Sequence, residues 1–182
     1  MPQNSIQIGI LGPCEMRIGD AAVPLGSFKQ RAVLAMLVIH RNRAVGIDEL
    51  IGAVWGDAPH SGARAALHTY VSNLRGLMAG EGIDTHAILA RTPPGYRLSL
   101  VDDDCDVGRF SAERSSGVHE LAAGRFEQAS DRLLVALSQW RGPVLDDLRD
   151  CTFFDVFATA LAEEKLMTQT LRAEAEIACG RA

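Results

Sequence analysis

Residues 29–78 read KQRAVLAMLVIHRNRAVGIDELIGAVWGDAPHSGARAALHTYVSNLRGLM and contain three helical patterns in close succession. In the third pattern, residues 63–78, apolar side chains recur three and four positions apart and so form one stripe of a helix. These side chains are Leu67, Tyr70, Val71, Leu74, Leu77 and Met78. The opposite face has donor-rich polar and basic side chains and almost no acid, which suits contact with the major groove of DNA. They are Arg64, His68, Thr69, Ser72, Asn73 and Arg75.

The segments on both sides of this helix favour DNA binding over an ordinary solvated surface helix. Residues 47–55 form a shorter helical pattern, and residues 56–62 are a breaker-rich connection. After the third helix, an apolar run, a Pro-Pro-Gly turn and an alternating segment predict a β-hairpin within residues 88–100. Two helices followed by a hairpin is the order of a winged helix-turn-helix, in which the second helix enters the groove and the hairpin lies beside it.

A small sheet and a buried helix are expected ahead of this motif. Residues 6–11, 15–18 and 21–25 read as short strands. Ser27 is expected to be the N-cap of a helix that runs to about His40. Because this segment is apolar almost all round from residue 32 to residue 39, we expect it to lie at the centre of the domain.

The rest of the chain predicts only helices, over residues 107–123, 125–140 and 153–179. The acidic stretch 102–106 lacks the glycine and the glutamate of a calcium-binding loop. We therefore expect a solvated linker there, with Asp106 as the N-cap of the next helix. The expected organisation is a winged-helix domain at residues 1–101, this linker, and an all-helical domain at residues 107–182.

The last helical pattern has a conspicuous apolar face, formed by Phe153, Phe154, Phe157, Leu161, Leu166 and Leu171. Few helices follow that could cover this face, and an uncovered apolar patch usually marks an interface. We therefore expect the chain to form a homo-oligomer or to bind a longer relative through this helix.

The charge distribution is compatible with DNA binding by the first half only. The net charge is −5, but residues 1–100 contain nine Lys or Arg and seven Asp or Glu, which gives +2. Residues 101–182 contain nine basic and sixteen acidic residues, which gives −7. The acidic second half would repel DNA, and the mildly basic first half can approach it.

Several other classes of protein are not supported by the sequence. No run of about eighteen apolar residues or signal-peptide pattern occurs, so we expect a cytoplasmic protein without a membrane partner. No nucleotide-binding, hydrolase or metalloprotease motif occurs, so an enzyme is not expected. The four cysteines are widely spaced and no ligand pair has zinc spacing, so we expect reduced structural thiols and neither a metal nor another cofactor.

A set of separated motifs resembles one family over nearly the whole chain. They are Gly12-Pro13, Val23-Pro24-Leu25-Gly26, Lys29-Gln30-Arg31-Ala32, Leu50 to Gly56, Tyr70 to Arg75, Pro93-Pro94-Gly95-Tyr96, Arg125 to Ala129 and Trp140 to Leu148. Their order resembles the Streptomyces antibiotic regulatory protein (SARP) family of transcriptional regulators. The resemblance implies an α+β winged helix-turn-helix of the OmpR/PhoB type, followed by an all-α, tetratricopeptide-like bacterial transcriptional activation domain. We expect that second domain to be incomplete, because such helical repeats need about three stacked units.

The resemblance also implies roles for individual residues. Thr69 and Asn73 are expected to contact bases, and Ser72 and Arg75 to contact phosphates. Tyr70 falls either near phosphate or in the core. The remaining DNA-contact candidates are Arg64 and His68 on the helix and Arg91 and Arg97 beside the wing turn. Asp57 and His60 lie in the connection that contacts RNA polymerase in this family.

Two hypotheses on function follow. The first is a sequence-specific transcriptional regulator that binds direct repeats in double-stranded promoter DNA and contacts RNA polymerase. Its recognition helix would be residues 63–78, and its wing, at residues 88–100, would meet the flanking backbone or the minor groove. The alternative is a truncated interaction module that binds a full-length regulator or a kinase and modulates it without strong DNA binding.

Overall fold

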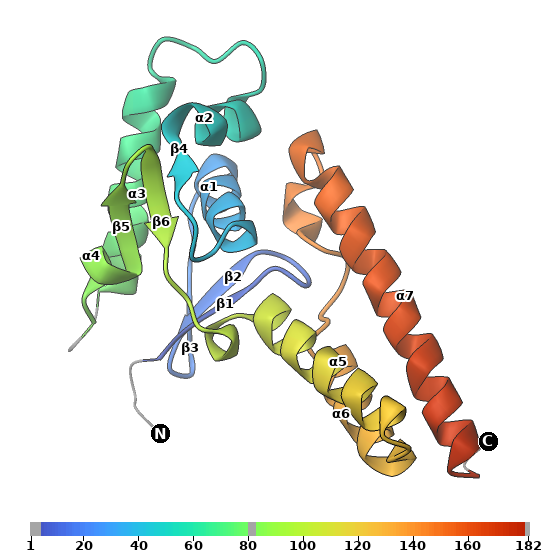
Figure 1. Ribbon diagram of the computed structural model, residues 1–182. Helices are drawn as coiled ribbons and strands as arrows, with labels where there is room; N and C mark the ends of the chain where they lie inside the picture. The colour runs from blue at the N-terminus through green and yellow to red at the C-terminus, as the bar shows by residue number, and fades with distance from the viewer. Residues whose placement is uncertain (1–4, 80–82, 181–182) are drawn as a thin grey trace.

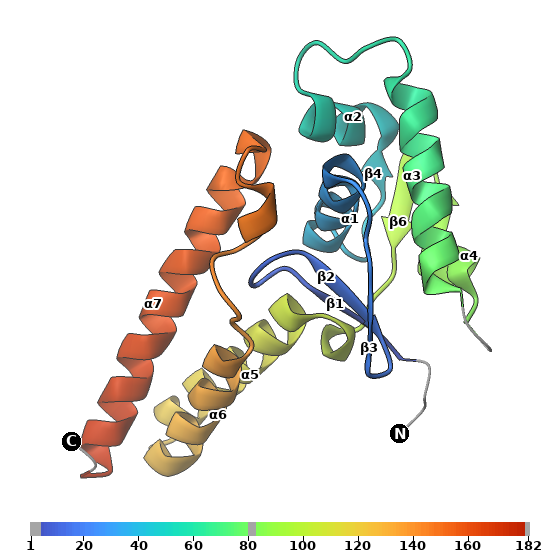
Figure 2. The ribbon, with the colours of Figure 1, turned by 180° about the vertical axis from the view of Figure 1, so that it is seen from behind.

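The computed structural model describes residues 5–79 and 83–180. Within these residues, two small sheets and four α-helices make up the first half of the chain, and three α-helices make up most of the second (Figure 1). The third helix, α3, and the last helix, α7, lie on opposite sides of the molecule in both views (Figures 1 and 2). The fold is therefore a winged helix-turn-helix followed by a helical domain, as the sequence predicts.

The N-terminal sheet is an antiparallel meander. Its strands are β1 (Ile6–Gly9), β2 (Glu15–Ile18) and β3 (Ala21–Val23), in that spatial order. In the register, Ile8 pairs with Met16, and both side chains are buried. All three strands expected in this region are present, although β1 and β3 end two residues earlier than the patterns suggested.

Helix α1 (Phe28–Ile39) is the centre of the first domain. Every side chain from Ala32 to Val38 is fully covered, with 0% relative exposure. Ser27 is the N-cap, and its hydroxyl accepts a hydrogen bond from the backbone N–H of Gln30 at 3.3 Å. Both the buried position of this helix and its cap are confirmed.

Helices α2 (Ile47–Trp55) and α3 (Ala63–Met78) pack on α1 and have the bounds that the sequence predicts. The wing sheet has the order β4-β6-β5, from β4 (Val45–Gly46), β6 (Gly95–Leu98) and β5 (Leu89–Thr92).

The apolar run ahead of the wing turn is only partly a strand, whereas its sequence pattern suggested a strand throughout. The segment Thr85–Ile88 is a helical turn, α4, and β5 begins only at Leu89. The Asp84 carboxylate accepts hydrogen bonds from the N–H groups of His86 and Ala87, and this cap stabilises helical backbone where the apolar run suggested a strand.

The acidic junction is exposed at Asp102 and Asp103, as expected of a solvated linker, but it has regular structure. Residues Asp102–Asp104 form a short 3-10 helix, η1. Cys105 then forms an isolated parallel β-bridge with Ile8 of β1. Asp106 is not the N-cap of α5 (Asp106–Ala122) but its first residue, and its side chain is only 3% exposed. The carboxylate binds backbone N–H groups of residues 10 and 11 instead, because the N-terminal sheet packs directly against the start of α5.

The second half begins with the pair α5 and α6 (Phe126–Ser138), which pack along each other. Two short 3-10 helices follow, η2 (Asp146–Leu148) and η3 (Thr152–Phe154), before the long helix α7 (Asp155–Ala178). None of the helices in the described residues is long and apolar enough to cross a membrane.

The expected apolar face of α7 is partly wrong. Phe154 and Leu161 are buried, since they pack into the continuous core with Leu145 and Leu148. Phe153 and Leu166 are exposed as expected. Besides Leu166 (63% exposed), the large apolar side chains that α7 leaves exposed are Val156 (82%), Met167 (56%) and Ile177 (66%), which were not expected.

Candidate nucleic-acid interface

Helix α3 has one face in the core and one face in solvent. The buried face consists of Ala63, Leu67, Val71, Leu74 and Met78. The exposed face consists of Arg64, Ala65, Thr69, Ser72, Asn73 and Gly76. Figure 2 shows α3 from its uncovered side, with no other element in front of it. The helix therefore presents a narrow strip of small and polar side chains along its full length.

Three of the predicted base or phosphate contacts lie on this strip. Thr69 donates its hydroxyl hydrogen to the Ala65 carbonyl at 3.1 Å, so its methyl group faces away from that bond. Ser72 is exposed, and no hydrogen bond of its side chain occurs within the described part of the chain. Asn73 is exposed too, but its Nδ2 donates to Gln30 Oε1 at 3.1 Å. The strip thus offers an amide and two hydroxyls at helical spacing, groups that can meet base edges.

Arg64 lies at the N-terminal end of the strip. Its guanidinium pairs with Asp48 of α2 at 2.8 Å, and both side chains are largely exposed. An exposed ion pair of this kind contributes between 0 and about 1 kcal/mol, so a phosphate can compete for the arginine.

His68 and Arg75 contact the wing rather than solvent. His68 Nδ1 lies 2.6 Å from the Tyr96 hydroxyl in β6. Arg75 donates two hydrogen bonds, from Nε at 2.9 Å and from Nη2 at 2.7 Å, to the carbonyl of Leu89 in β5, and its guanidinium lies 5.9 Å from the Tyr96 ring. Both residues therefore fix the position of the wing on α3, which the polar-face pattern of the sequence did not indicate.

Tyr70 belongs to the edge of the core. Its ring stacks on Trp55 of α2, with a centroid separation of 6.0 Å and an interplanar angle of 14°. The Lys29 ammonium lies over the same Trp55 ring, with Nζ 5.1 Å from the ring centroid. Of the two positions that the sequence left open for Tyr70, the structure shows the packed one.

The wing presents two arginines to solvent. Arg91 in β5 and Arg97 in β6 are exposed, and within the described residues neither guanidinium has a hydrogen bond or an ion pair. Tyr96, between them in sequence, is buried against α3. These arginines are thus the cations of the wing that remain available to a phosphate backbone.

The connection between α2 and α3 forms an exposed arch above both helices (Figure 1). Asp57 and His60 both lie in it and are exposed. His60 Nδ1 accepts a hydrogen bond from the N–H of Gly62 at 3.1 Å, and its ring packs edge-on against Trp55 at 6.2 Å. Asp57 is free to meet a partner, and His60 is held at the base of the arch.

Two carboxylates join the helical half to the winged-helix half. Asp106 accepts from the N–H groups of Ile10 and Leu11 at 2.9 and 2.8 Å, and Arg141 Nη2 lies 3.2 Å from it. Asp147 accepts from Arg31 Nε in α1 at 2.6 Å and from the N–H of residue 14 at 2.7 Å. Both links span more than ninety residues of sequence, so they could not be read from local patterns.

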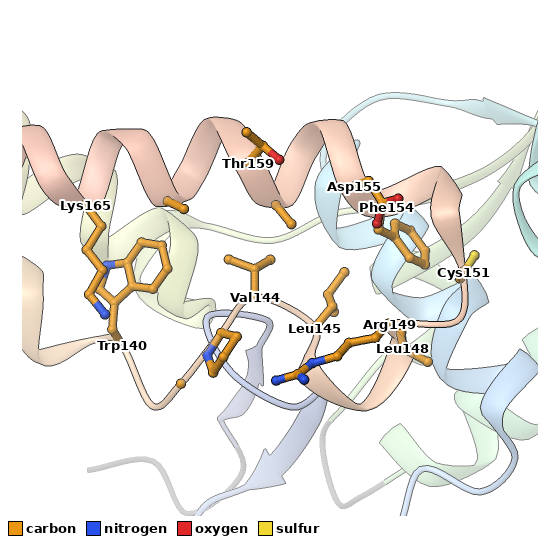
Figure 3. A pocket seen from close by; sticks show the side chains of 14 residues that line it. Trp140, Val144, Leu145, Leu148, Arg149, Cys151, Phe154, Asp155, Thr159 and Lys165 are labelled. Carbon is orange, nitrogen blue, oxygen red and sulfur yellow. The ribbon is translucent and has the colours of Figure 1, made fainter.

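A groove of about 700 Å³ lies under the N-terminal half of α7 (Figure 3). Its wall is mainly apolar, from Val144, Leu145 and Phe154, with Thr159 of α7 opposite. At one end, Lys165 Nζ lies 4.7 Å from the centre of the Trp140 ring. The size is within the range of small-molecule sites, which is about 300–1,000 Å³. The groove belongs to the helical half, away from α3.

The cysteines have structural environments. Burial raises the pKa of the Cys14 and Cys105 thiols, and therefore favours their neutral, unreactive form. All four thiols are free in the structure, and no cluster of three or more metal-ligating side chains occurs in residues 5–79 and 83–180.

Two family models match the chain in the order of its two structural halves. Residues 23–98 match the model described as "Transcriptional regulatory protein, C terminal", and residues 105–182 match the "Bacterial transcriptional activator domain". A curated relative, "Transcriptional regulatory protein EmbR" from Mycobacterium tuberculosis, is 61% identical over 180 residues. That alignment covers 99% of this chain and 46% of EmbR.

The chain belongs to the SARP family.

Other members of the SARP family are similar to lesser degrees. MoaR1 from Mycobacterium tuberculosis is 46% identical over 180 residues, which cover 98% of this chain and 58% of MoaR1. AfsR from Streptomyces coelicolor is 33% identical over 143 residues, which cover 78% of this chain and 14% of AfsR. The resemblance to the SARP family that the motifs indicated is confirmed, and the chain is particularly similar to EmbR. The chain spans about half the length of the EmbR and MoaR1 relatives.

A solved structure of a SARP member has the same fold. "Mycobacterium tuberculosis EmbR in complex with low affinity phosphopeptide" superposes with a TM-score of 0.95 and 62% sequence identity. The superposition covers 97% of this chain and 47% of that chain. The arrangement of α3, the wing and the helical half is therefore one that a SARP protein adopts.

One residue that contributes to the interface was not singled out by the sequence. Gln30 occurs in the Lys-Gln-Arg motif, but nothing in a single polar residue of a helix indicates which side chain it contacts. Only the packing of α1 against α3 brings Gln30 to Asn73.

Proposed function

We propose that this chain is a sequence-specific DNA-binding transcriptional regulator. Helix α3 enters the major groove, and the wing lies at the flanking backbone or minor groove of a promoter direct repeat. The observation that carries the proposal is the exposed strip of α3, which contains hydroxyls, one amide and one arginine and no acidic side chain. Membership of the SARP family, whose members listed above have transcriptional regulator names, supports the same function.

Within this proposal, different residues have different tasks. Thr69 and Asn73 meet base edges, and Ser72, Arg64, Arg91 and Arg97 meet phosphates. Arg75, His68 and Tyr70 act indirectly, since each already has a partner within the fold. Phosphate contacts set the orientation of a protein on DNA, and base contacts supply its sequence preference.

The partners follow from the same geometry. Asp57 and His60, in the exposed arch between α2 and α3, are candidate contacts for RNA polymerase. The EmbR structure contains a phosphopeptide, and a phosphorylating kinase is therefore a partner worth testing for this chain as well.

The experiment is selection of bound sequences from a random duplex pool by the purified chain, followed by titration of the enriched duplex in a salt series. We expect one enriched motif. With two to three free cations per interface, log K should fall with log salt with a slope of about −2. A pool that stays random after repeated rounds would contradict the proposal, because a bare interaction module has no sequence preference.

Asn73→Ala is expected to lower discrimination more than total affinity. A bidentate base contact contributes about 1–3 kcal/mol of discrimination, and its loss leaves phosphate contacts in place. The measurement is competition between the enriched duplex and duplexes substituted at single positions. Arg97→Ala serves as the matched control, since loss of a phosphate contact should weaken all duplexes alike. A uniform loss with Asn73→Ala would assign that residue to the backbone.

An interaction module is the second candidate, favoured by the apolar side chains that α7 exposes. Val156 and Met167 are eleven positions apart, three helical turns, and so lie on one stripe. Through this stripe the chain would pair with a second copy or with a longer SARP relative.

We expect the chain to self-associate at tens of micromolar in sedimentation, and the double substitution Val156→Glu with Met167→Glu to abolish association. Leu134→Glu on α6, which is also exposed, is the control and should have no effect. A wild-type chain that remains monomeric across the concentration series contradicts this role for α7.

A further inference from the structure

Gln30 is a buried amide at the start of α1. Its side chain is only 6% exposed, and the backbone N–H of the same residue is held by the Ser27 hydroxyl. The Nε2 group donates to the Leu25 carbonyl at 2.8 Å, and Oε1 accepts from Asn73 Nδ2 at 3.1 Å. Both ends of this carboxamide are therefore engaged, one by the backbone and one by the exposed face of α3.

The polarity of this chain of hydrogen bonds is determined at one end. A backbone carbonyl only accepts, so the NH₂ end of Gln30 must face Leu25. The oxygen of Gln30 then faces α3, and because it also only accepts, Asn73 must present its NH₂ group. The orientation of an amide is assigned from its partners, and here each partner leaves a single assignment.

The consequence lies on the outer side of Asn73. The NH₂ group has two hydrogens, and one of them is used by Gln30. The second hydrogen and the carbonyl oxygen remain, and they supply the donor and the acceptor that adenine N7 and N6 require. An Asn side chain without this contact could rotate and present the reverse edge.

We propose that Gln30 is a specificity-determining positioning residue that holds the Asn73 amide in the orientation that reads adenine. This inference rests on the proposed DNA-binding function. It adds a residue outside the recognition helix, one that would not touch DNA itself.

The turn that contains Leu25, whose carbonyl accepts the hydrogen bond from Gln30, is itself held in place. The carbonyl of Gly26, next to Leu25, accepts from Arg31 Nη1 at 2.6 Å. The same guanidinium pairs through Nε with Asp147 of the helical half. The orientation of Asn73 thus depends on a segment that both halves of the molecule immobilise.

The test uses the full chain and the duplex enriched by it from a random pool. The adenine read by Asn73 is the position at which substitution weakens binding of the wild type but not of Asn73→Ala. Gln30→Met, which keeps length and apolar packing but removes the amide, should lower discrimination at this adenine about tenfold, the size of one base contact. In the Asn73→Ala background, Gln30→Met should cause no further loss of discrimination, because Gln30 acts only through Asn73.

The control is Ser27→Ala, which removes the cap of α1 but leaves the amide chain. Ser27→Ala should lower the melting temperature without changing discrimination. If Gln30 had only a structural role, Gln30→Met would have the same two results. Wild-type discrimination in Gln30→Met, additive losses in the double variant, or the absence of an adenine dependent on Asn73 would each overturn the inference. A pool without any enriched motif would instead contradict the proposed function itself.

A second measurement does not require a folded Gln30 variant. Nuclear magnetic resonance relaxation of the Asn73 side-chain nitrogen, assigned by its loss in Asn73→Ala, should report an ordered amide in the free protein. A freely rotating Asn73 side chain would overturn the inference.

Discussion

Asp106→Asn is expected to lower the free energy of unfolding by about 3 kcal/mol, since breaking a buried charged hydrogen-bond network is among the most destabilising single changes. The carboxylate accepts from the backbone N–H groups of Ile10, Leu11 and Val107, and Arg141 lies beside it. An asparagine of the same size has one acceptor and two donors. Its NH₂ group would face backbone donors, and Arg141 would lose one of its two carboxylate partners, keeping only Glu15.

Urea denaturation of the full chain measures this effect. Asp103→Asn is the matched control, because Asp103 is exposed in the same acidic stretch and should change stability by no more than about 0.5 kcal/mol. Equal stabilities for the two variants would mean that the sheet and α5 are not joined as described.

The second large effect is expected for Gly95→Ala in the wing, which should cost about 3 kcal/mol by forcing two strands apart. A Cβ at Gly95 would lie 2.0 Å from the Val45 carbonyl oxygen and 2.8 Å from the Ile47 nitrogen. These are backbone atoms of β4 and of the start of α2, so no side chain can rotate to make room. The pairing of β4 with β6 would be lost, and with it the fixed position of the wing.

Gly76→Ala is the control within the same domain, and its effect on stability should have the opposite sign. It lies in the exposed strip of α3, and a Cβ there would meet nothing within 4 Å. Replacing a mid-helix glycine by alanine should raise the free energy of unfolding by about 0.5–1 kcal/mol. Thermal denaturation followed by circular dichroism compares the two, and a Gly95→Ala protein as stable as the wild type would contradict the wing packing.

Much of the first domain could be predicted because its signals are local. The apolar run from Ala32 to Val38 requires a buried helix, and Ser27 marks where that helix begins. The apolar stripe of residues 63–78 identifies the buried face of α3, and thus also its exposed face. Such periodic patterns depend on neighbours within one or two turns, which the sequence contains.

The features that could not be predicted depend on partners far along the chain. Asp106 looked like a helix cap, yet its partners are the N–H groups of residues ninety-five and ninety-six positions earlier. The sequence could not show that the guanidinium of Arg75, a predicted phosphate contact, binds the Leu89 carbonyl, fourteen residues later. The buried state of Leu161 depends on the packing of α7 into the core that other elements form. A pattern within one helix specifies its polar face but not which polar side chains the rest of the fold engages.

The most direct test of the central claim uses the unmodified chain with DNA that contains 5-bromodeoxyuridine in the enriched motif. The bromine projects into the major groove, so ultraviolet irradiation joins it to the side chain that lies there. Trypsin cleaves after Arg64 and Arg75, which places most of the exposed strip of α3 in one peptide, AALHTYVSNLR. If α3 lies in the major groove, mass spectrometry should find the crosslink in this peptide. A crosslink confined to the wing or to the helical half, with α3 unmodified, would contradict this placement.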